Sequence, residues 1–220
     1  MKNDDLFMPK AAIFDIDGLM LDTEGPAIHL WPVAGRNFGW DIKEETVLRT
    51  LGINDDDTCE IFKQELGRDF PYEKILNEFY RLYYEMFEKG IAHKEGLIPL
   101  LDHFSSLKIP LAVATSSPVS GACIKLEKAG ILDRFTALAC GDEIDNGKPA
   151  PDIFLLAAKK LGVAPSGCVG FEDSAAGLMG LHLAGIRSVF VKDILMPPEE
   201  VLATVWKRCG NLAEAIELFG

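Results

Sequence analysis

The sequence predicts an α/β protein, in which a parallel sheet is covered by helices on both faces and a smaller helical domain is inserted near the start of the chain. From about residue 97 onward, short apolar runs alternate with amphipathic segments, as in a parallel sheet buried on both sides. Between residues 19 and 89 the apolar residues instead recur at helical spacing, without a convincing buried strand. A chain of 220 residues that is 48% hydrophobic can form a large core in one large or two unequal domains.

Five short apolar runs are predicted strands, and five amphipathic segments are predicted helices. The strands are expected at residues 11–14, 111–114, 137–140, 168–170 and 188–191. The helices are expected at residues 97–107, 118–129, 151–161, 174–184 and 197–206. Proline begins three of these helices, which suits the first turn because the N–H that proline lacks has no partner there. Glycine follows three of them, as is common after the last turn of a helix.

The inserted segment contains one clear helix with an aromatic face. The residues of this face are Tyr72, Ile75, Leu76, Phe79, Tyr83, Met86 and Phe87. We expect the face to pack among neighbouring helices rather than to bind a cofactor. A second helix is indicated by the spacing of Ala27, Leu30, Trp31, Ala34 and Phe38. Pro32 falls inside this second helix and should kink or break it.

The predicted domains are an α/β core of residues 1–19 and 91–220 and a helical cap of residues 20–90. The formal charge of −12 and the pI of about 4.8 work against sequence-independent nucleic-acid binding and against docking on anionic lipid. The first residues lack the apolar core of a signal peptide, and no later apolar stretch is long enough to cross a bilayer. Five dispersed cysteines indicate neither a disulfide framework nor a zinc site. We therefore expect a cytoplasmic protein, monomeric or weakly self-associating, that acts on a small molecule.

Two aspartates, Asp15 and Asp17, stand at the end of the first predicted strand, in the run Ile-Phe-Asp-Ile-Asp-Gly. Two unpaired carboxylates at a strand end repel each other and resist desolvation. Such a pair therefore indicates a bound cation or a chemical task. Phosphoryl transfer through an aspartyl intermediate is one such task.

Other polar residues follow at corresponding points of the predicted sheet. The second predicted strand leads into the hydroxyls of Thr115 and Ser116 before a helix, where hydroxyl and N–H groups can hold phosphoryl oxygens. The fourth predicted strand leads into Glu172 and Asp173. Lys148 lies on a loop stiffened by two prolines and is a suitable point charge for a phosphate. Ligands of open α/β sheets bind outside the carboxyl ends of the strands, so we expect these groups to converge there.

Each of these residues also has an ordinary structural explanation when it is taken alone. A hydroxyl or an aspartate before a helix can simply cap it, Asp-Gly is a common turn pair, and most lysines are solvated. Taken together, the four groups favour a single site. They follow one another in the sequence as an acid pair, a hydroxyl pair, a lysine and a second acid pair, and three of them follow predicted strands.

The run Asp-Ile-Asp-Gly-Leu-Met-Leu-Asp-Thr-Glu, which begins at Asp15, resembles the first motif of the haloacid dehalogenase-like (HAD) hydrolase superfamily. Thr115 is similar to the second motif of that family and Lys148 to the third, and Glu172 with Asp173 resembles the fourth. The helical insert resembles the cap of the β-phosphoglucomutase-like and phosphoglycolate phosphatase-like branch. The resemblance implies a Rossmann-like, HAD-like core with an inserted α-helical cap, and a phosphoric monoester hydrolase.

The resemblance also implies catalytic roles. Asp15 would be the nucleophile that becomes an aspartyl phosphate. Asp17 would protonate the departing oxygen and then take a proton from the water that hydrolyses the intermediate. Thr115, Ser116 and Lys148 would bind the phosphoryl oxygens and stabilise their charge.

A Mg²⁺ cofactor is implied as well, because this ion prefers hard oxygen ligands. Its expected ligands are Asp15, the backbone carbonyl of Asp17 and Asp173, with Glu172 close by or bound through water. The expected function is a Mg²⁺-dependent phosphatase acting on a small phosphorylated metabolite such as a sugar phosphate.

Residues of the predicted cap separate hydrolysis from a phosphosugar mutase, which is the main alternative. The β-phosphoglucomutases bind a second phosphate through a cap arginine, in a segment like Gly-x-Ser-Arg-x-Asp-Ser, and carry a histidine shortly after the first motif. Here Asp55, within residues 52–58, stands in place of the arginine, and Ala27 stands in place of the histidine. Both differences favour plain hydrolysis.

Three further alternatives are weaker. A dehalogenase would not need Asp17, Glu172 and Asp173. A phosphonatase would need a Schiff-base lysine in the cap, for which Lys43 is a candidate by its existence alone. A non-enzymatic phosphate switch like a response-regulator receiver uses similar groups, but Asp17 would speed the loss of the phosphoryl group that a switch must keep.

Overall fold

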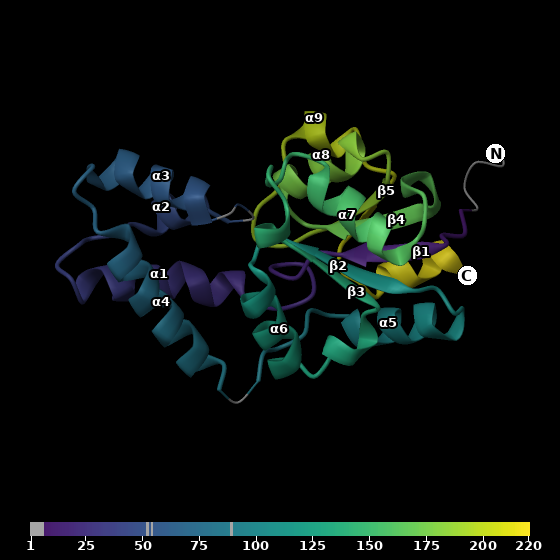
Figure 1. Ribbon diagram of the computed structural model, residues 1–220, viewed down its shortest axis with the longest axis horizontal. Helices are drawn as coiled ribbons and strands as arrows, with labels where there is room; N and C mark the ends of the chain where they lie inside the picture. Colours follow the sequence, from purple (N-terminus) through teal and green to yellow (C-terminus); the bar gives the residue numbers. More distant parts are fainter. Residues whose placement is uncertain (1–6, 52, 54, 89) are drawn as a thin grey trace.

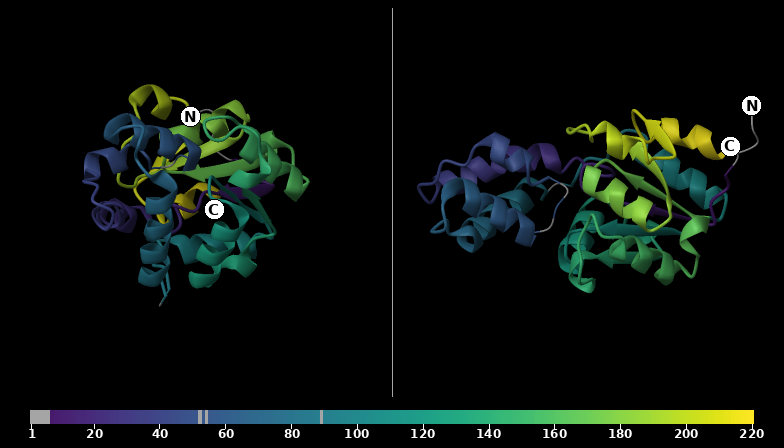
Figure 2. Two further views of the ribbon diagram at one scale, coloured as in Figure 1. Left: turned by 60° about the vertical axis from the view of Figure 1, so that its left-hand side comes forward. Right: turned by 90° about the horizontal axis from the view of Figure 1, so that it is seen from above.

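The computed structural model describes residues 7–220 except residues 52, 54 and 89. The chain forms two lobes, an α/β core and a group of helices to one side of it (Figure 1). The four helices are α1 (Glu24–Arg36), α2 (Glu44–Leu48), α3 (Asp55–Leu66) and α4 (Tyr72–Met86). They lie in the chain between the first strand of the core and its first helix, so the chain crosses between the lobes twice (Figure 2). We call these helices the cap.

Six parallel strands form the sheet of the core, in the order β3-β2-β1-β4-β5-β6. The strands are β1 (Ala11–Phe14), β2 (Leu111–Thr115), β3 (Ala137–Cys140), β4 (Cys168–Glu172), β5 (Arg187–Val191) and β6 (Lys207–Cys209). The central strand β1 pairs with β2 on one side and with β4 on the other, so that Phe14 lies opposite Val113 and Phe171. The residues that follow β1 therefore emerge between the ends of β2 and β4, where the strand order reverses and α/β proteins place their ligands.

Helices cover both faces of the sheet (Figure 1). One face carries α5 (Leu97–Ser106) and α6 (Val119–Lys128), and the other carries α7 (Asp152–Leu161) and α8 (Ala175–Leu183), with the short α9 (Glu199–Leu202) against α8. Successive side chains of β1 point to opposite faces of the sheet and pack against the helices on each side. Ile13 packs with α7, whereas Phe14 packs with Phe104 of α5. Among the described residues, the core also has the 3₁₀ segments η2 (Leu132–Arg134), η3 (Gly141–Glu143), η4 (Pro165–Gly167) and η5 (Glu214–Phe219).

The parallel α/β fold is confirmed, and the predicted strands at 11–14 and 137–140 have the predicted bounds. The strands at 111–114, 168–170 and 188–191 are each one or two residues longer, so Thr115 and Glu172 are last residues of strands rather than residues after them. The helix predicted at 197–206 is wrong in extent: α9 spans only Glu199–Leu202, and β6 follows it. Lys-Arg-Cys is too short and too charged to be recognised as a strand, and its pairing with β5 is a tertiary effect.

Of the predicted kink or break at Pro32, the break is wrong, because α1 runs from Glu24 to Arg36 with this proline inside it, and the kink stays a prediction. Burial outweighs the local cost of the proline: Trp31 stacks on Phe79 of α4 at 4.5 Å and lies 4.6 Å from Phe62 of α3, between ring centroids. The aromatic face of α4 is buried among the cap helices as expected, except that Met86 is 56% exposed.

The second crossing into the core is held by the C-terminal segment of the chain. The carbonyl of Glu95 accepts a hydrogen bond of 3.1 Å from the N–H of Leu212. Gly96, with a φ of +85°, lies so close to Ala213 that a Cβ at position 96 would stand 2.0 Å from the nitrogen of Ala213. Only glycine fits this position without moving the backbone of the neighbouring segment.

The domain limits at 1–19, 20–90 and 91–220 stay predictions, and residues 1–6 and 89 lie outside the described part of the chain. Gly52 and Asn54 also lie outside it, as does the side chain of Asp55, on which the comparison with the mutases partly depends. No helix in the described part of the chain combines the length and the apolar character of a membrane span.

Phe104 tests the packing of the core away from the site. Its fully buried ring contacts those of Phe14, Phe171 and Phe219. We expect Phe104→Ala to lower the free energy of unfolding by about 3–5 kcal/mol, because it leaves a cavity among these rings. The control Leu107→Ala, at the half-exposed end of the same helix, should cost less than about 1 kcal/mol. Urea unfolding measures both, and equal losses would contradict this account of the core.

Candidate active site

Most of the residues singled out in the sequence line one cavity between the sheet and the cap. Asp15, Asp17, Thr115, Lys148 and Asp173 all line it from the carboxyl ends of the strands or the loops that follow them. Ser116 lines it as well. On the opposite side the wall consists of cap residues, which are Ala27, Trp31, Thr50, Leu51, Ile53, Thr58, Leu76, Phe79, Tyr80 and Tyr83. The predicted convergence of the acid, hydroxyl and lysine groups is therefore what the fold produces.

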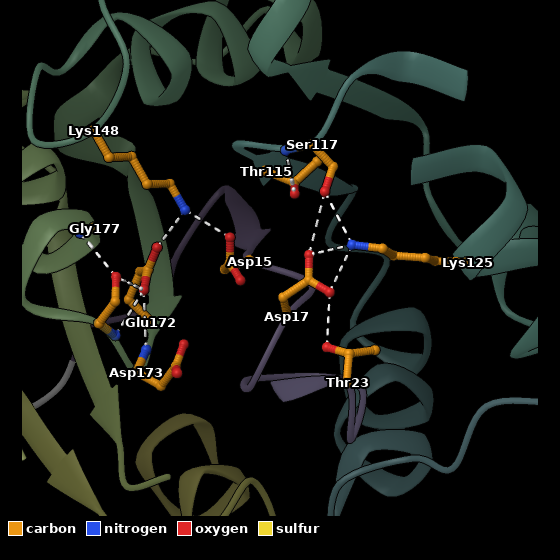
Figure 3. Close-up of polar contacts among 11 residues, drawn as sticks. Asp15, Asp17, Thr23, Thr115, Ser117, Lys125, Lys148, Glu172, Asp173 and Gly177 are labelled. Atoms are coloured by element: carbon orange, nitrogen blue, oxygen red, sulfur yellow. Dashed lines mark hydrogen bonds and ion pairs between the residues drawn. The ribbon is translucent and has the colours of Figure 1, made fainter. Parts of the chain in front are cut away.

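Asp15 and Glu172 share one buried lysine. The Nζ of Lys148 lies 2.6 Å from Oδ1 of Asp15 and 2.5 Å from Oε1 of Glu172 (Figure 3). Burial raises the pKa of Asp15 to about 7, even though the ammonium of Lys148 acts to lower it. Burial also opposes the charge of Lys148, but the two carboxylates hold its pKa above the ordinary value. The lysine therefore stays charged and carries its charge to the end of β1.

Both carboxylate oxygens of Glu172 are occupied by contacts within the protein. Oε1 faces Lys148, and Oε2 accepts hydrogen bonds of 3.0 Å from the N–H groups of Asp173 and Ser174 and from the Ser174 hydroxyl. The same hydroxyl accepts a hydrogen bond from the N–H of Gly177 and caps α8. Glu172 does not line the cavity and has no exposed surface. These contacts make it an anchor for Lys148 and for the start of α8, and the place at or near a metal that the resemblance implies for it stays a prediction.

Asp17 is held on the opposite side of the cavity by three donors (Figure 3). Oδ1 accepts a hydrogen bond of 2.7 Å from the hydroxyl of Thr23, and Oδ2 accepts one of 3.3 Å from Ser117. The Nζ of Lys125 contacts both oxygens, at 2.7 and 2.6 Å. Burial acts to raise the pKa of Asp17, but the Lys125 ammonium and the hydrogen bonds outweigh it and lower this pKa.

Sequence reasoning missed Lys125. It lies three residues after Ala122 and four before Ala129, on the buried face of α6, where a lysine needs a partner. A charged residue on an apolar helical stripe is the signal that would have found it. Thr23 and Ser117 are neighbours of motif residues and carried no separate signal.

A third group of acids lies beside Asp173. Glu24, Asp173 and Asp193 bring carboxylate oxygens within 4.8 Å of one another. Within the described residues, Oδ1 of Asp173 and Oδ2 of Asp193 are buried without a hydrogen-bond partner. Burial and the neighbouring acids raise the pKa of Glu24 to about 9 and that of Asp173 well above its usual range. The other oxygen of Asp193 faces Lys94 at 2.5 Å.

The sequence did not point to Glu24 or Asp193 as members of a site. Glu24 occurs in the first motif but begins α1 in the cap. Asp193 follows β5, at the same edge of the sheet as the motif residues, so the rule for strand ends is the signal that would have found it.

Thr115 ends β2 and is 1% exposed, and its Oγ1 accepts a hydrogen bond of 3.2 Å from the N–H of Ser117. Because Oγ1 of Thr115 is the acceptor in this hydrogen bond, the hydroxyl proton of Thr115 is left to donate to another group. Both Thr115 and Ser116 line the cavity. Lys43, the candidate Schiff-base lysine, is exposed and paired with Asp41, and it does not line the cavity.

Residues 12–191 match a protein-family model described as "Haloacid dehalogenase-like hydrolase". A phosphorylated carbohydrates phosphatase of Thermotoga maritima is 29% identical over 181 residues, covering 82% of this chain and 84% of that protein. A probable pseudouridine-5'-phosphatase of Drosophila melanogaster is 31% identical over 202 residues, covering 86% and 84%. The crystal structure of a β-phosphoglucomutase from Clostridium difficile is similar with a TM-score of 0.81 and 26% identity, covering 96% of this chain and 97% of that one.

Gly177 tests the anchoring of Glu172. A Cβ at position 177 would lie 1.8 Å from Oε1 of Glu172, the oxygen that faces Lys148. We expect Gly177→Ala to displace this carboxylate and to lower the free energy of unfolding by about 1–3 kcal/mol or more. The control is Gly121→Ala in α6, where the nearest atom would lie 3.7 Å away, so that the change should stabilise or leave the protein unchanged. Equal behaviour of the two variants in urea unfolding would show that Glu172 is not tightly placed.

Proposed function

The chain belongs to the haloacid dehalogenase-like hydrolase family and is a phosphatase, and we propose that it is a Mg²⁺-dependent one that releases phosphate from a small phosphorylated sugar or similar metabolite. The observation that carries the proposal is the arrangement of Asp15 and Asp17 at the end of β1. Asp15 lies beside a buried lysine, whereas Asp17, two residues on, faces hydroxyls and a second lysine. Two carboxylates in such different surroundings suit a nucleophile and an acid/base.

In the first half-reaction a carboxylate oxygen of Asp15 attacks the phosphorus of the substrate. The bond between phosphorus and the leaving oxygen breaks, and protonated Asp17 donates its proton to that oxygen. Lys148 offsets negative charge on the nucleophile and on the transferring group, and its anchoring by Glu172 keeps it in place. The hydroxyls of Thr115 and Ser116 are the donors that this edge of the cavity offers to the phosphoryl oxygens.

In the second half-reaction a water molecule attacks the phosphorus of the aspartyl phosphate. The bond between phosphorus and Asp15 breaks, its electron pair stays on the carboxylate, and Asp17 takes a proton from the water. Phosphate is released, and both aspartates return to the states in which they began.

The acids next to Asp15 fit a Mg²⁺ ion. They present hard oxygen ligands, and the oxygens of Asp173 and Asp193 that lack partners within the described residues are the kind of atom that a cation satisfies. We propose that Asp15, the backbone carbonyl of Asp17 and Asp173 hold the ion, with Glu24 and Asp193 beside them. When bound, the ion reduces the repulsion between the Asp15 carboxylate and the dianionic phosphate.

The cap side of the cavity favours hydrolysis over a phosphosugar mutase. A mutase has to hold a second phosphate, which calls for a cation on the cap side. Among the described lining residues the cations are Lys125 and Lys148, and both belong to the core and are paired with acids. Ala27 lines the cavity where those mutases carry a histidine. The named activity of the Thermotoga relative supports a phosphorylated carbohydrate as substrate.

Replacing the nucleophile tests the reaction. We expect the protein with Mg²⁺ to release phosphate from p-nitrophenyl phosphate and from sugar phosphates, and Asp15→Asn to abolish this because an amide cannot form the aspartyl ester. The control Asp133→Asn changes an exposed aspartate of the core and should keep full activity. Conversion of β-glucose 1-phosphate to glucose 6-phosphate without phosphate release would instead establish the mutase.

Thermal unfolding tests the metal site without an activity assay. Mg²⁺ should raise the Tm of the wild-type protein, because it binds the folded state, and it should leave the Tm of Asp173→Asn unchanged. Without Mg²⁺ the variant should be at least as stable as the wild type, since a carboxylate crowded by other acids has been removed. Asp133→Asn should respond to Mg²⁺ like the wild type, and an equal response in Asp173→Asn would refute the assignment of this ligand.

A further inference from the structure

Lys125 is a buried lysine that has no role in the reaction steps proposed above. It lies in the last turn of α6 and is 7% exposed. Its ammonium contacts both oxygens of Asp17 and, at 3.0 Å, the hydroxyl of Ser117. The ring of Tyr83, on cap helix α4, covers it at 5.9 Å from the ring centroid. The ammonium thus lies where α6, the end of β2 and the cap meet.

Packing does not explain a lysine at this position. The neighbours of Lys125 on the same face of α6 are the apolar residues Ala122, Leu126 and Ala129, so an uncharged side chain of similar length would suit the helix. Burying an ammonium costs several kcal/mol unless close acceptors repay it, and those acceptors are here the oxygens of Asp17. The charge at position 125 is therefore explained by Asp17.

The contacts of Asp17 depend mainly on this lysine. The carboxylate accepts four contacts, of which Lys125 supplies two, at 2.7 and 2.6 Å. Of the other two, Thr23 is close at 2.7 Å and Ser117 is long at 3.3 Å. Ser117 is itself a partner of Lys125, so loss of the ammonium would loosen this contact as well. Asp17 would then keep a single short hydrogen bond, which leaves its carboxylate free to rotate.

We propose that Lys125 is a positioning residue that fixes the direction of the Asp17 side chain so that it can accept the proton of the attacking water. The proposal rests on the function proposed above. Because the Lys125 ammonium contacts both oxygens of Asp17, it fixes how this side chain is turned toward the reacting atoms. In the step that follows, the water oxygen bonds to phosphorus, the bond from phosphorus to Asp15 breaks, and the water proton passes to Asp17. Lys125 therefore acts on the hydrolysis of the aspartyl phosphate.

The test separates the two half-reactions with p-nitrophenyl phosphate. Its leaving group is a weak base that needs little protonation, so kcat/KM, which covers the steps up to the aspartyl phosphate, depends little on Asp17. We expect Lys125→Met to lower kcat by about tenfold to a hundredfold while kcat/KM stays within about threefold. Stopped-flow measurement should then show a burst of p-nitrophenolate that approaches one equivalent per active site, because the aspartyl phosphate accumulates.

Three variants control the experiment. Lys125→Arg keeps the charge and should recover most of kcat and lose the burst. Lys128→Met removes an exposed lysine one turn further along α6 and should match the wild type. Lys125→Gln can still donate a hydrogen bond to Asp17 but carries no charge, and we expect it to show the burst. It provides a second test if the methionine variant fails to fold.

The outcomes distinguish this inference from the proposed function. A wild-type protein that releases no phosphate from any phosphorylated metabolite with Mg²⁺ would refute the function, and the inference with it. If the wild type is active but kcat and kcat/KM fall together in the Lys125 variants without a burst, Lys125 has only a structural role. Unchanged kinetics in folded Lys125→Met would equally overturn the inference and leave the phosphatase intact.

Discussion

The structure depends on how it accommodates buried negative charge at one edge of the sheet. Parallel strands bring the acids of three separate chain segments to the same place, and the cap adds Glu24 to them. Two buried lysines offset part of this charge, Lys148 between Asp15 and Glu172 and Lys125 beside Asp17. The acids around Asp173 face one another instead, and within the described residues two of their oxygens have no partner. Lysines thus offset the negative charge on two sides of the site. On the third side, the acids around Asp173 offer oxygens that suit a divalent ion.

The strand order explains why these groups meet. Because β1 lies between β2 and β4, a residue just after β1 has a hydroxyl-bearing strand end on one side and an acid-bearing strand end on the other. Glu172 then links the site to the fold, since it binds Lys148 with one oxygen and the start of α8 with the other. Stability and the placement of the Lys148 charge are therefore coupled at Glu172, and the absence of a side chain at Gly177 leaves room for the Glu172 carboxylate.

Much of the fold could be predicted from the sequence, because buried parallel strands are apolar runs and covering helices are amphipathic, and both patterns are local. The residues of the site could be predicted for the same reason, since Asp15, Thr115 and Glu172 lie at or next to the ends of such runs. What the sequence did not provide depends on contacts between distant segments. The pairing of β6, the continuity of α1 through Pro32 and the partnership of Lys125 with Asp17 all arise from tertiary packing. Which oxygen of Glu172 faces which donor likewise depends on the three-dimensional packing of distant segments.

The contact between Gly96 and Ala213 joins the last part of the chain to the second crossing between the lobes. The residues after β6 therefore support the segment through which the chain returns from the cap to the core. In the sequence these residues lie far from the cap and from the motif residues of the candidate site. A chain shortened before residue 212 would still contain the residues of every strand and of the candidate site, yet it would lose the backbone bond that fixes Glu95 and the buried ring of Phe219. A bulkier residue at position 96 would therefore require the backbone at residue 213 to take another route.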